Sequence, residues 1–200
     1  MVGAELSVNI VFRDRWLLVV DKPAGTLTQG TEKERGIFEE LQDKERYVGL
    51  HHRLDRPASG LVLFTVDRRA NKGISARMQA HEIDRTYSAV LSGRCESGTW
   101  DQPVSRRTAR SEVRVLDVSG GFSQVEVSLH TGRKHQIRVH AALNRTPVLG
   151  DRRYGAEAGR MWPRLALHAR RLALKHPITG ERLELESPIP DDLSELWQGS

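Results

Sequence analysis

Short stretches in which hydrophobic and polar residues alternate recur along the chain, and this period of two is typical of β-strands with one buried face. The clearest stretch is 122–129, which alternates hydrophobic Val125, Val127 and Leu129 with polar Gln124, Glu126 and Ser128. Further strands are predicted at 10–12, 16–21, 60–66, 87–91, 165–169 and 182–187. The pattern therefore predicts a protein built largely from short strands.

Three segments carry hydrophobic residues at the spacing of an amphipathic helix. The first spans 36–46, and the second spans 68–81 with Asp67 placed to cap its N-terminus. The third spans about 134–144, and Thr131 is the predicted cap. These helices are few and separated by strands.

Strands outnumber helices, and their spacing does not follow the rhythm of βαβ units. Residues 94–112 are interpreted as a loop, and a short acidic helix is expected to begin at Asp191 and end near Trp197. No repeat or Pro/Gly/Ser-rich linker divides the chain. We therefore expect one α+β domain over residues 1–200, with a largely antiparallel sheet.

Composition narrows the class of protein. A chain of 200 residues with 38% hydrophobic content can bury a proper core, and its one cysteine, Cys95, excludes a disulfide framework. No hydrophobic run approaches the roughly 20 residues of a membrane helix, and the N-terminal residues lack the pattern of a signal peptide. We expect a soluble cytoplasmic protein with no membrane partner.

Positive charge is concentrated in one part of the chain. Residues 133–175 contain 11 basic and 2 acidic side chains, whereas 176–200 contain 1 and 6. Most of the cations are arginines, whose planar guanidinium pairs with phosphate and stacks on bases. A solvated basic face would give the same count, but nucleic acid is the favoured partner.

The segment HHRLDRPASG (51–60) places Asp55 between two arginines. Neighbouring cations favour the ionised carboxylate, which suits a nucleophile or a base. A surface carboxylate that caps a loop is the structural alternative. Lys22, in a Lys-Pro-Ala-Gly turn, is interpreted as a structural residue or a phosphate contact.

The segment TGRKHQIRVH (131–140) would place several donors near a helix N-terminus, where anions bind. A metal site is not expected, because His135 and His140 would lie roughly 140° apart around a helix. The sequence contains no HExxH metal motif, no glycine-rich nucleotide loop and no GxSxG element. We therefore expect no metal and no cofactor.

Seven motifs, in this order, resemble the RluA-type family of RNA pseudouridine synthases. They are VVDKPAG (19–25), HRLDRPASG (52–60), RTYSAVLSG (85–93), TGRKHQIRVH (131–140), PVLGDRRYG (147–155), LALHARRLALKHPITGERL (165–183) and PIPDD (188–192). The resemblance covers nearly the whole chain. It implies a mixed, mostly antiparallel sheet flanked by helices and loops, without a separate N-terminal RNA-binding domain. It also implies isomerisation of uridine in transfer or ribosomal RNA. We expect a monomer.

The resemblance also implies roles for individual residues. Asp55 would be the catalytic carboxylate, Tyr87 would stack on the flipped base and assist proton removal from C5, and Arg138 would pair with Asp55. Arg53 would displace the target uridine, and Leu165 would pack around the site. His52, Arg133 and Lys134 complete the expected substrate-binding set. The chain departs from the family pattern at Ala58, where threonine is usual, and at Lys134.

The sequence is also compatible with two other functions. An RNA-binding protein without turnover would share the basic surface but would not need Asp55, Tyr87 and Arg138 together. A hydrolase of glycosidic bonds would use Asp55 as nucleophile and a second carboxyl group as acid. Asp151 is the one other carboxylic acid inside the motif at 147–155 that could serve.

Overall fold

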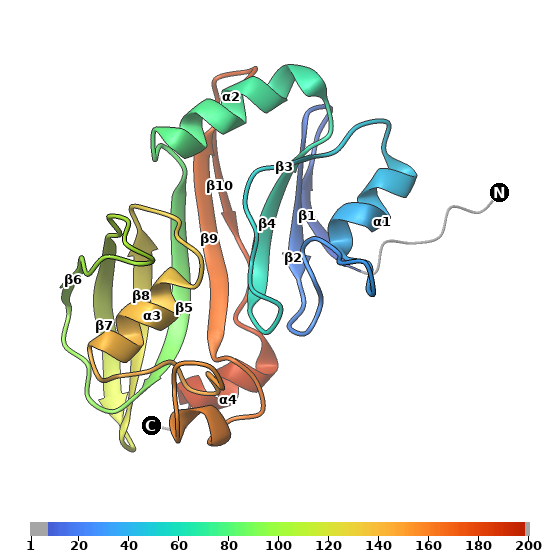
Figure 1. The fold of residues 1–200 in the computed structure, drawn as a ribbon. Coiled ribbons are helices and arrows are strands. Elements are labelled where there is room, and N and C mark those ends of the chain that lie inside the picture. The colour runs from blue at the N-terminus through green and yellow to red at the C-terminus, as the bar shows by residue number, and fades with distance from the viewer. Residues whose placement is uncertain (1–7, 199–200) are drawn as a thin grey trace. The chain divides into compact units, whose positions relative to one another are not determined.

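The computed structural model describes residues 8–198, which divide into two compact units. Unit 1 comprises the chain up to Ile83 together with Arg171–Ser187. Unit 2 comprises Asp84–Arg170 together with the chain from Pro188 onward. Figure 1 shows the elements of each unit in the colours of the chain.

Unit 1 is built on antiparallel strands. Strand β2 (Leu17–Lys22) pairs with β1 (Asn9–Arg13) on one side and with β4 (Ser59–Thr65) on the other. The two-residue strand β3 (Gly49–Leu50) pairs with the end of β4. Residues 171–175 of β9 (Leu167–Lys175) pair with β10 (Arg182–Glu186), and residues 176–181 connect the two strands.

Two helices, α1 (Ile37–Lys44) and α2 (Arg68–Gln79), complete unit 1. Ala70 and Ile74 of α2 belong to a hydrophobic core that includes Leu17 and Leu63. All seven residues of β4 are buried, which explains why its sequence is a hydrophobic run with little alternation.

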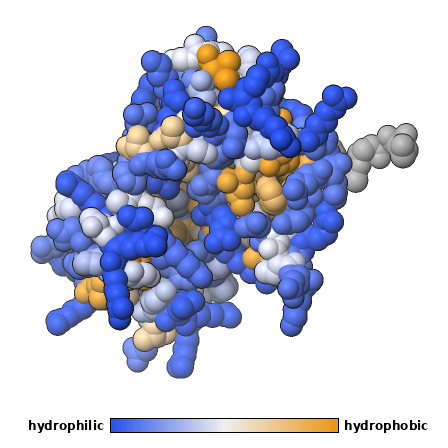
Figure 2. Space-filling view, turned by 45° about the horizontal axis from the view of Figure 1, so that its top comes forward, coloured by the Kyte–Doolittle hydropathy of each residue, from blue (hydrophilic) through white to orange (hydrophobic). Residues whose placement is uncertain are grey.

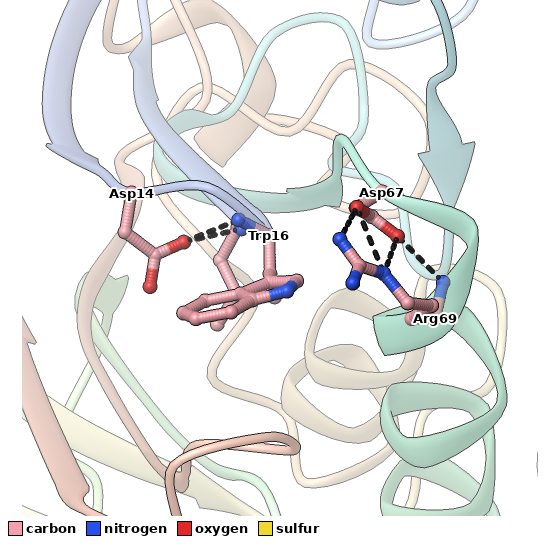
Figure 3. A network of polar contacts seen from close by, with 5 residues as sticks. Asp14, Trp16, Asp67 and Arg69 are labelled. Atoms are coloured by element: carbon pink, nitrogen blue, oxygen red, sulfur yellow. Dashed lines mark hydrogen bonds and ion pairs between the residues drawn. The ribbon is translucent and has the colours of Figure 1, made fainter.

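Short carboxylate-to-backbone bonds fix the ends of these elements. Asp14 accepts hydrogen bonds of 2.7 Å from the backbone N–H groups of Trp16 and Leu17, which closes the turn between β1 and β2 (Figure 3). Asp67 caps α2 by accepting from the backbone N–H of Arg69 at 2.9 Å. Hydrogen bonds from the Arg69 side chain lower the pKa of Asp67 to about 2. The predicted cap of this helix is confirmed.

Unit 2 contains a meander of antiparallel strands. Strand β8 (Phe122–Leu129) lies between β5 (Asp84–Ser92) and β7 (Ser111–Ser119), and β7 also pairs with β6 (Gly98–Trp100). The unit also contains α3 (Gln136–Leu143), the short 3-10 helix η1 (Ala158–Arg160) and α4 (Asp191–Gln198).

The α+β class with mostly antiparallel strands is confirmed, but two local predictions are wrong. Residues 94–112 are not one loop, because they contain β6 and the start of β7. Thr131 does not cap α3. The N-cap is His135, which has a left-handed backbone with φ of 58°. The Thr131 hydroxyl instead donates to the Gln136 side chain at 2.7 Å.

The surface carries no large continuous hydrophobic face in the view of Figure 2, where hydrophobic residues form patches separated by hydrophilic side chains. The large hydrophobic residues that are exposed in residues 8–198 are Ile10, Val118, Leu143, Met161 and Ile178. Within the same residues, no helix combines the length and the hydrophobicity that crossing a membrane requires.

Candidate functional site

Asp55 lies in unit 1, in the turn that leads directly into β4. Its side chain is half-buried, and its backbone carbonyl accepts from the N–H of Ala58 at 3.0 Å. The preceding Leu54 is buried, whereas Arg53 and Arg56 are exposed. The local fold thus anchors the turn through Leu54 and leaves the two arginines at the surface.

Lys22 is completely buried and contacts the backbone of this turn. Its ammonium group donates to the carbonyl oxygens of Pro23 at 2.9 Å, Thr26 at 2.8 Å and Arg56 at 3.2 Å. A buried cation is tolerated only when its donors are satisfied, and these three bonds contribute to that. Lys22 is therefore a structural residue that ties the Lys-Pro-Ala-Gly turn to the residue after Asp55.

Leu54, the residue before Asp55, is also fixed by hydrogen bonds to its backbone. The Thr28 hydroxyl is bonded to both the carbonyl and the N–H of Leu54, each at 3.1 Å. Gly25 and Arg56 also bond to each other, with Gly25 N–H donating to the Arg56 carbonyl and Arg56 Nε donating to the Gly25 carbonyl, both at 2.8 Å. The segment 22–28 therefore fixes the backbone on both sides of Asp55.

Two of the expected substrate-binding residues lie beside this turn. Arg53 is exposed, and its Nη1 donates to Gln29 Oε1 at 3.2 Å. His52 is half-buried, and its Nε2 accepts from the N–H of Leu63 at 3.0 Å, so this nitrogen is unprotonated. Unit 1 thus brings together His52, Arg53 and Asp55, and their roles stay predictions.

Arg138 lies on α3 in unit 2 and forms a buried ion pair with Asp151. Its Nε and Nη2 donate to the two carboxylate oxygens, both at 2.8 Å, and the side chains are 7% and 0% exposed. This bidentate geometry fixes the guanidinium plane. Sequence reasoning did not find this partner, although both residues fall within the quoted motifs. The expected pairing of Arg138 with Asp55 concerns residues of different units and stays a prediction.

The same ion pair determines the protonation state of Asp151. Burial opposes ionisation, but hydrogen bonds from Arg138 and from the N–H groups of Tyr154 and Arg153 outweigh it and lower the pKa of Asp151. A general acid must hold a proton near neutral pH, and this carboxyl group is ionised there. Asp151 is therefore unsuited to be the acid that a glycoside hydrolase would need.

Tyr154 extends the network around Arg138. The guanidinium carbon of Arg138 lies 5.2 Å from the centroid of the Tyr154 ring, and Arg153 lies 5.4 Å from the same centroid. The Tyr154 hydroxyl is 3.0 Å from Nδ1 of His135, the residue that precedes α3. Arg138 is therefore held by a carboxylate and an aromatic ring.

Tyr87 and Leu165 are both buried in unit 2, and backbone hydrogen bonds join the strand of Tyr87 to Ala166, the residue after Leu165. Tyr87 lies on β5 opposite Val127. Val90 lies three residues after Tyr87 on β5. Its N–H donates to the carbonyl of Ala166 at 3.1 Å, and its carbonyl accepts from the N–H of Leu149 at 2.9 Å. The chain at 149–151, the Leu165 segment and the strand of Tyr87 thus lie side by side.

Arg133 and Lys134 lie in the turn before α3, and Gln136 organises that turn. The Gln136 side chain is buried, accepts from Thr131 Oγ1 and Arg133 N, and donates to the Arg110 carbonyl and Ser111 Oγ. Arg133 is half-buried and donates to the Thr108 carbonyl at 3.0 Å. Lys134 is exposed. Gln136 was not singled out from the sequence, although it lies in the quoted TGRKHQIRVH motif.

His140 on α3 is structural. Its Nε2 donates to the Gln102 carbonyl at 2.8 Å, and its Nδ1 lies 3.1 Å from Ser111 Oγ. Burial lowers the pKa of His140, which favours this neutral form. In the described part of the chain, no group of three or more His, Cys, Asp or Glu residues is arranged to hold a metal ion.

The family model and the related proteins that match this chain belong to the same family. The family model described as RNA pseudouridylate synthase matches residues 16–143. Ribosomal large subunit pseudouridine synthase D of Pseudomonas aeruginosa is 34% identical, with 96% of this chain and 71% of that protein covered. A Bacillus subtilis protein named uncharacterized RNA pseudouridine synthase YhcT is 33% identical, with 95% of this chain and 71% of that protein covered.

Solved structures show the same fold. The structure of human RNA pseudouridylate synthase domain containing 4 matches with a TM-score of 0.79 and 23% identity, covering 93% of this chain and 90% of that chain. The structure of human RNA pseudouridylate synthase domain containing 1 matches with a TM-score of 0.75 and 24% identity, covering 97% and 94%.

Proposed function

Because the chain belongs to the RNA pseudouridylate synthase family, we propose that it isomerises specific uridines of structured RNA, ribosomal or transfer, to pseudouridine. Membership of this family makes it an isomerase. The relatives named for the ribosomal large subunit favour ribosomal RNA. The site of action would be the cytoplasm, and the chain would work as a single catalytic domain and a monomer.

The reaction conserves the atoms of the nucleotide. The N1–C1′ bond of uridine breaks, the C5–C1′ bond forms, C5 loses a proton and N1 gains one. This balance needs no oxidant, metal or cofactor. The base must first leave its stack, which costs a few kcal/mol, and stacking on an aromatic ring returns about 1–3 kcal/mol. We assign this stacking to Tyr87.

Asp55 is the proposed catalytic carboxylate, acting on C1′ directly or by another route of glycosidic cleavage. The arrangement of its turn carries this assignment, because Lys22 and Thr28 fix the backbone on both sides of Asp55. A catalytic group needs such positioning to reach its target in one geometry. Arg138, oriented by Asp151, is the proposed cationic partner of Asp55.

Five residues are proposed to bind the RNA rather than to react with it: Arg53, His52, Leu165, Arg133 and Lys134. Exposure of Arg53 and Lys134 supports phosphate contacts. The burial of Leu165 supports packing next to the base. The competing hydrolase is disfavoured, because Asp151 is held as a carboxylate by Arg138.

The test is tritium release from ribosomal and transfer RNA labelled at uridine C5. We expect release by the wild type and by Asp43→Asn, which changes an exposed carboxylate of α1, and none by Asp55→Asn. Release of free uracil would identify a hydrolase instead. Retained RNA binding without release from either RNA by the wild type would identify a binding protein without turnover.

A further inference from the structure

A pocket of about 860 Å³ lies in unit 2, in the segment that follows the Arg138–Asp151 ion pair along the chain. Its volume is within the roughly 300–1,000 Å³ typical of ligand sites. It is lined by Arg152, Ala156, Glu157, Gly159, Arg160, Met161, Trp162 and Pro163. None of these residues has a role in the reaction proposed above.

Ion pairs hold both ends of this segment. At its start, Asp151 is bonded to Arg138. At its end, Arg164 directs Nε and Nη2 to the carboxylate of Asp192, with the Nη2 bond at 2.6 Å. Residues 152–163 therefore form a loop whose two ends are fixed, and Asp151 connects it to the arginine of the proposed site.

Hydrophobic surface in the pocket comes from Met161 and Trp162. Met161 is 52% exposed and borders the pocket. Trp162 is half-buried, and its indole Nε1 is a buried donor without a hydrogen-bond partner in the described part of the chain. A flat ring placed against Met161 and Trp162 would remove this hydrophobic surface from water.

Charged groups in the pocket favour an anionic ligand. Arg152 and Arg160 are exposed and form no ion pair within residues 8–198, so their guanidinium groups are available to phosphate. Glu157 can accept a hydrogen bond from an exocyclic amino group, which adenine carries and uracil lacks. A cationic rim beside an aromatic side chain is the combination that binds single-stranded nucleic acid.

We propose that the pocket at 152–163 binds a nucleotide that flanks the target uridine, with its base against Trp162 and its phosphate between Arg152 and Arg160. The proposal rests on the proposed function, because it takes RNA as the substrate. It deepens that function by assigning part of substrate selection to a loop next to the Arg138–Asp151 pair.

The first test uses the heptanucleotide of adenosine, which contains no uridine and therefore reports binding without turnover. Stacking of a base on Trp162 should quench tryptophan fluorescence of the full chain. Trp16→Phe is the matched control, because Trp16 is also half-buried with an unpartnered buried Nε1 but lies in unit 1 against His176. We expect Trp16→Phe to keep the quenching and Trp162→Phe to lose it. Equal quenching in both variants would overturn the proposal.

A second test addresses the phosphate. Each phosphate contact makes the slope of log affinity against log salt more negative by about 0.7 for a single strand. We expect this slope to become less negative for Arg160→Gln and to stay unchanged for Arg94→Gln, which alters an exposed arginine outside the pocket. Equal slopes for the two variants would contradict the proposed phosphate position.

The last test separates this proposal from the proposed function. Loss of the stacking contact should raise KM for labelled RNA about tenfold in Trp162→Ala and leave kcat unchanged, because the contact exists before and during the reaction. An unchanged KM would overturn the proposal. If the wild type released no tritium, the proposed function would fail, while quenching by the adenosine heptanucleotide would still decide whether the pocket binds a nucleotide.

Discussion

Lys22 in unit 1 and Arg138 in unit 2 are both buried cations beside proposed functional groups, but they are held by different acceptors. Three backbone carbonyl oxygens accept from Lys22, whereas both carboxylate oxygens of Asp151 accept from Arg138. Bonds to carbonyls fix the course of the backbone around Asp55. Bonds to a carboxylate fix the plane of the guanidinium itself and balance its charge. One cation therefore positions a neighbouring loop, and the other is itself positioned.

The largest effect is expected from Asp151→Asn, which removes the charge that balances Arg138. Breaking a buried ion pair on one side costs about 3–5 kcal/mol, because the other charge stays buried. Asp192→Asn is the matched control, since Arg164 approaches Asp192 through the same two nitrogens but the Asp192 side chain is 45% exposed. That change should cost at most about 1 kcal/mol. Urea unfolding of both variants measures the difference, and equal losses would contradict the comparison.

The pH dependence of stability sharpens this prediction. The pKa of Asp151 is lowered in the folded protein, so its stabilisation is present above the ordinary value of 3.8 and is lost as pH falls below it. The wild type should therefore lose more stability than Asp151→Asn between pH 5 and acid conditions. Urea midpoints measured over that range check the sign. A steeper acid loss in the variant would be the contrary result.

The next effect is expected from Lys22→Met, which keeps the length of the side chain but removes the ammonium group. Three carbonyls would lose a hydrogen bond from a charged group, but the cost of burying the ammonium would also disappear, so we expect a net loss of about 1.5–3 kcal/mol. We expect a lower urea midpoint and a lower kcat for tritium release, because the backbone after Asp55 is no longer held. Full activity in the folded variant would show that Lys22 does not position the Asp55 turn.

The sequence predicts the elements that have a strong local pattern, but not those that depend on contacts between distant residues. Elements with a strong local pattern were predicted, among them the buried strand β4 and the helix that Asp67 caps. Strand β7 is not predicted, although Val113 and Val115 alternate with polar residues. Its pairing with β8 depends on contacts that single-sequence patterns do not reveal.

The predicted site residues lie inside sequence motifs, whereas the residues that bond to them or to their neighbours are distant along the chain. Asp55, Tyr87 and Arg138 are predicted as site residues because they lie inside motifs. The partners that hold them are not, since Thr28 is 26 residues from Leu54 and Asp151 is 13 residues from Arg138. Thr131 was assigned to the helix N-terminus by residue type, but its hydroxyl bonds to the Gln136 side chain instead. Residue type predicts which groups can bond, whereas the fold determines which of them meet.

A smaller effect is expected from Thr28→Val, which has nearly the same shape but lacks the hydroxyl. Both bonds to the Leu54 backbone would be lost, at about 0.5–1.5 kcal/mol each. Thr31→Val is the control, because Thr31 is exposed and its hydroxyl accepts only a 3.3 Å bond from Lys33 N within the described chain. Urea unfolding should separate the two variants. Equal stability would mean that Thr28 does not hold the residue before Asp55.

The smallest effect is expected at His140, which is held by a carbonyl like Lys22 but is neutral. Burial lowers its pKa in the folded protein, so the unfolded chain binds the proton more tightly and stability falls as pH decreases below the ordinary value of 6.5. One proton changes the stability by at most about 1.4 kcal/mol per pH unit. His140→Gln should flatten the loss of stability between pH 7 and 5, measured by urea unfolding. Some slope should remain, because burial also lowers the pKa of His51. If the slope were unchanged, protonation of His140 would not be coupled to unfolding.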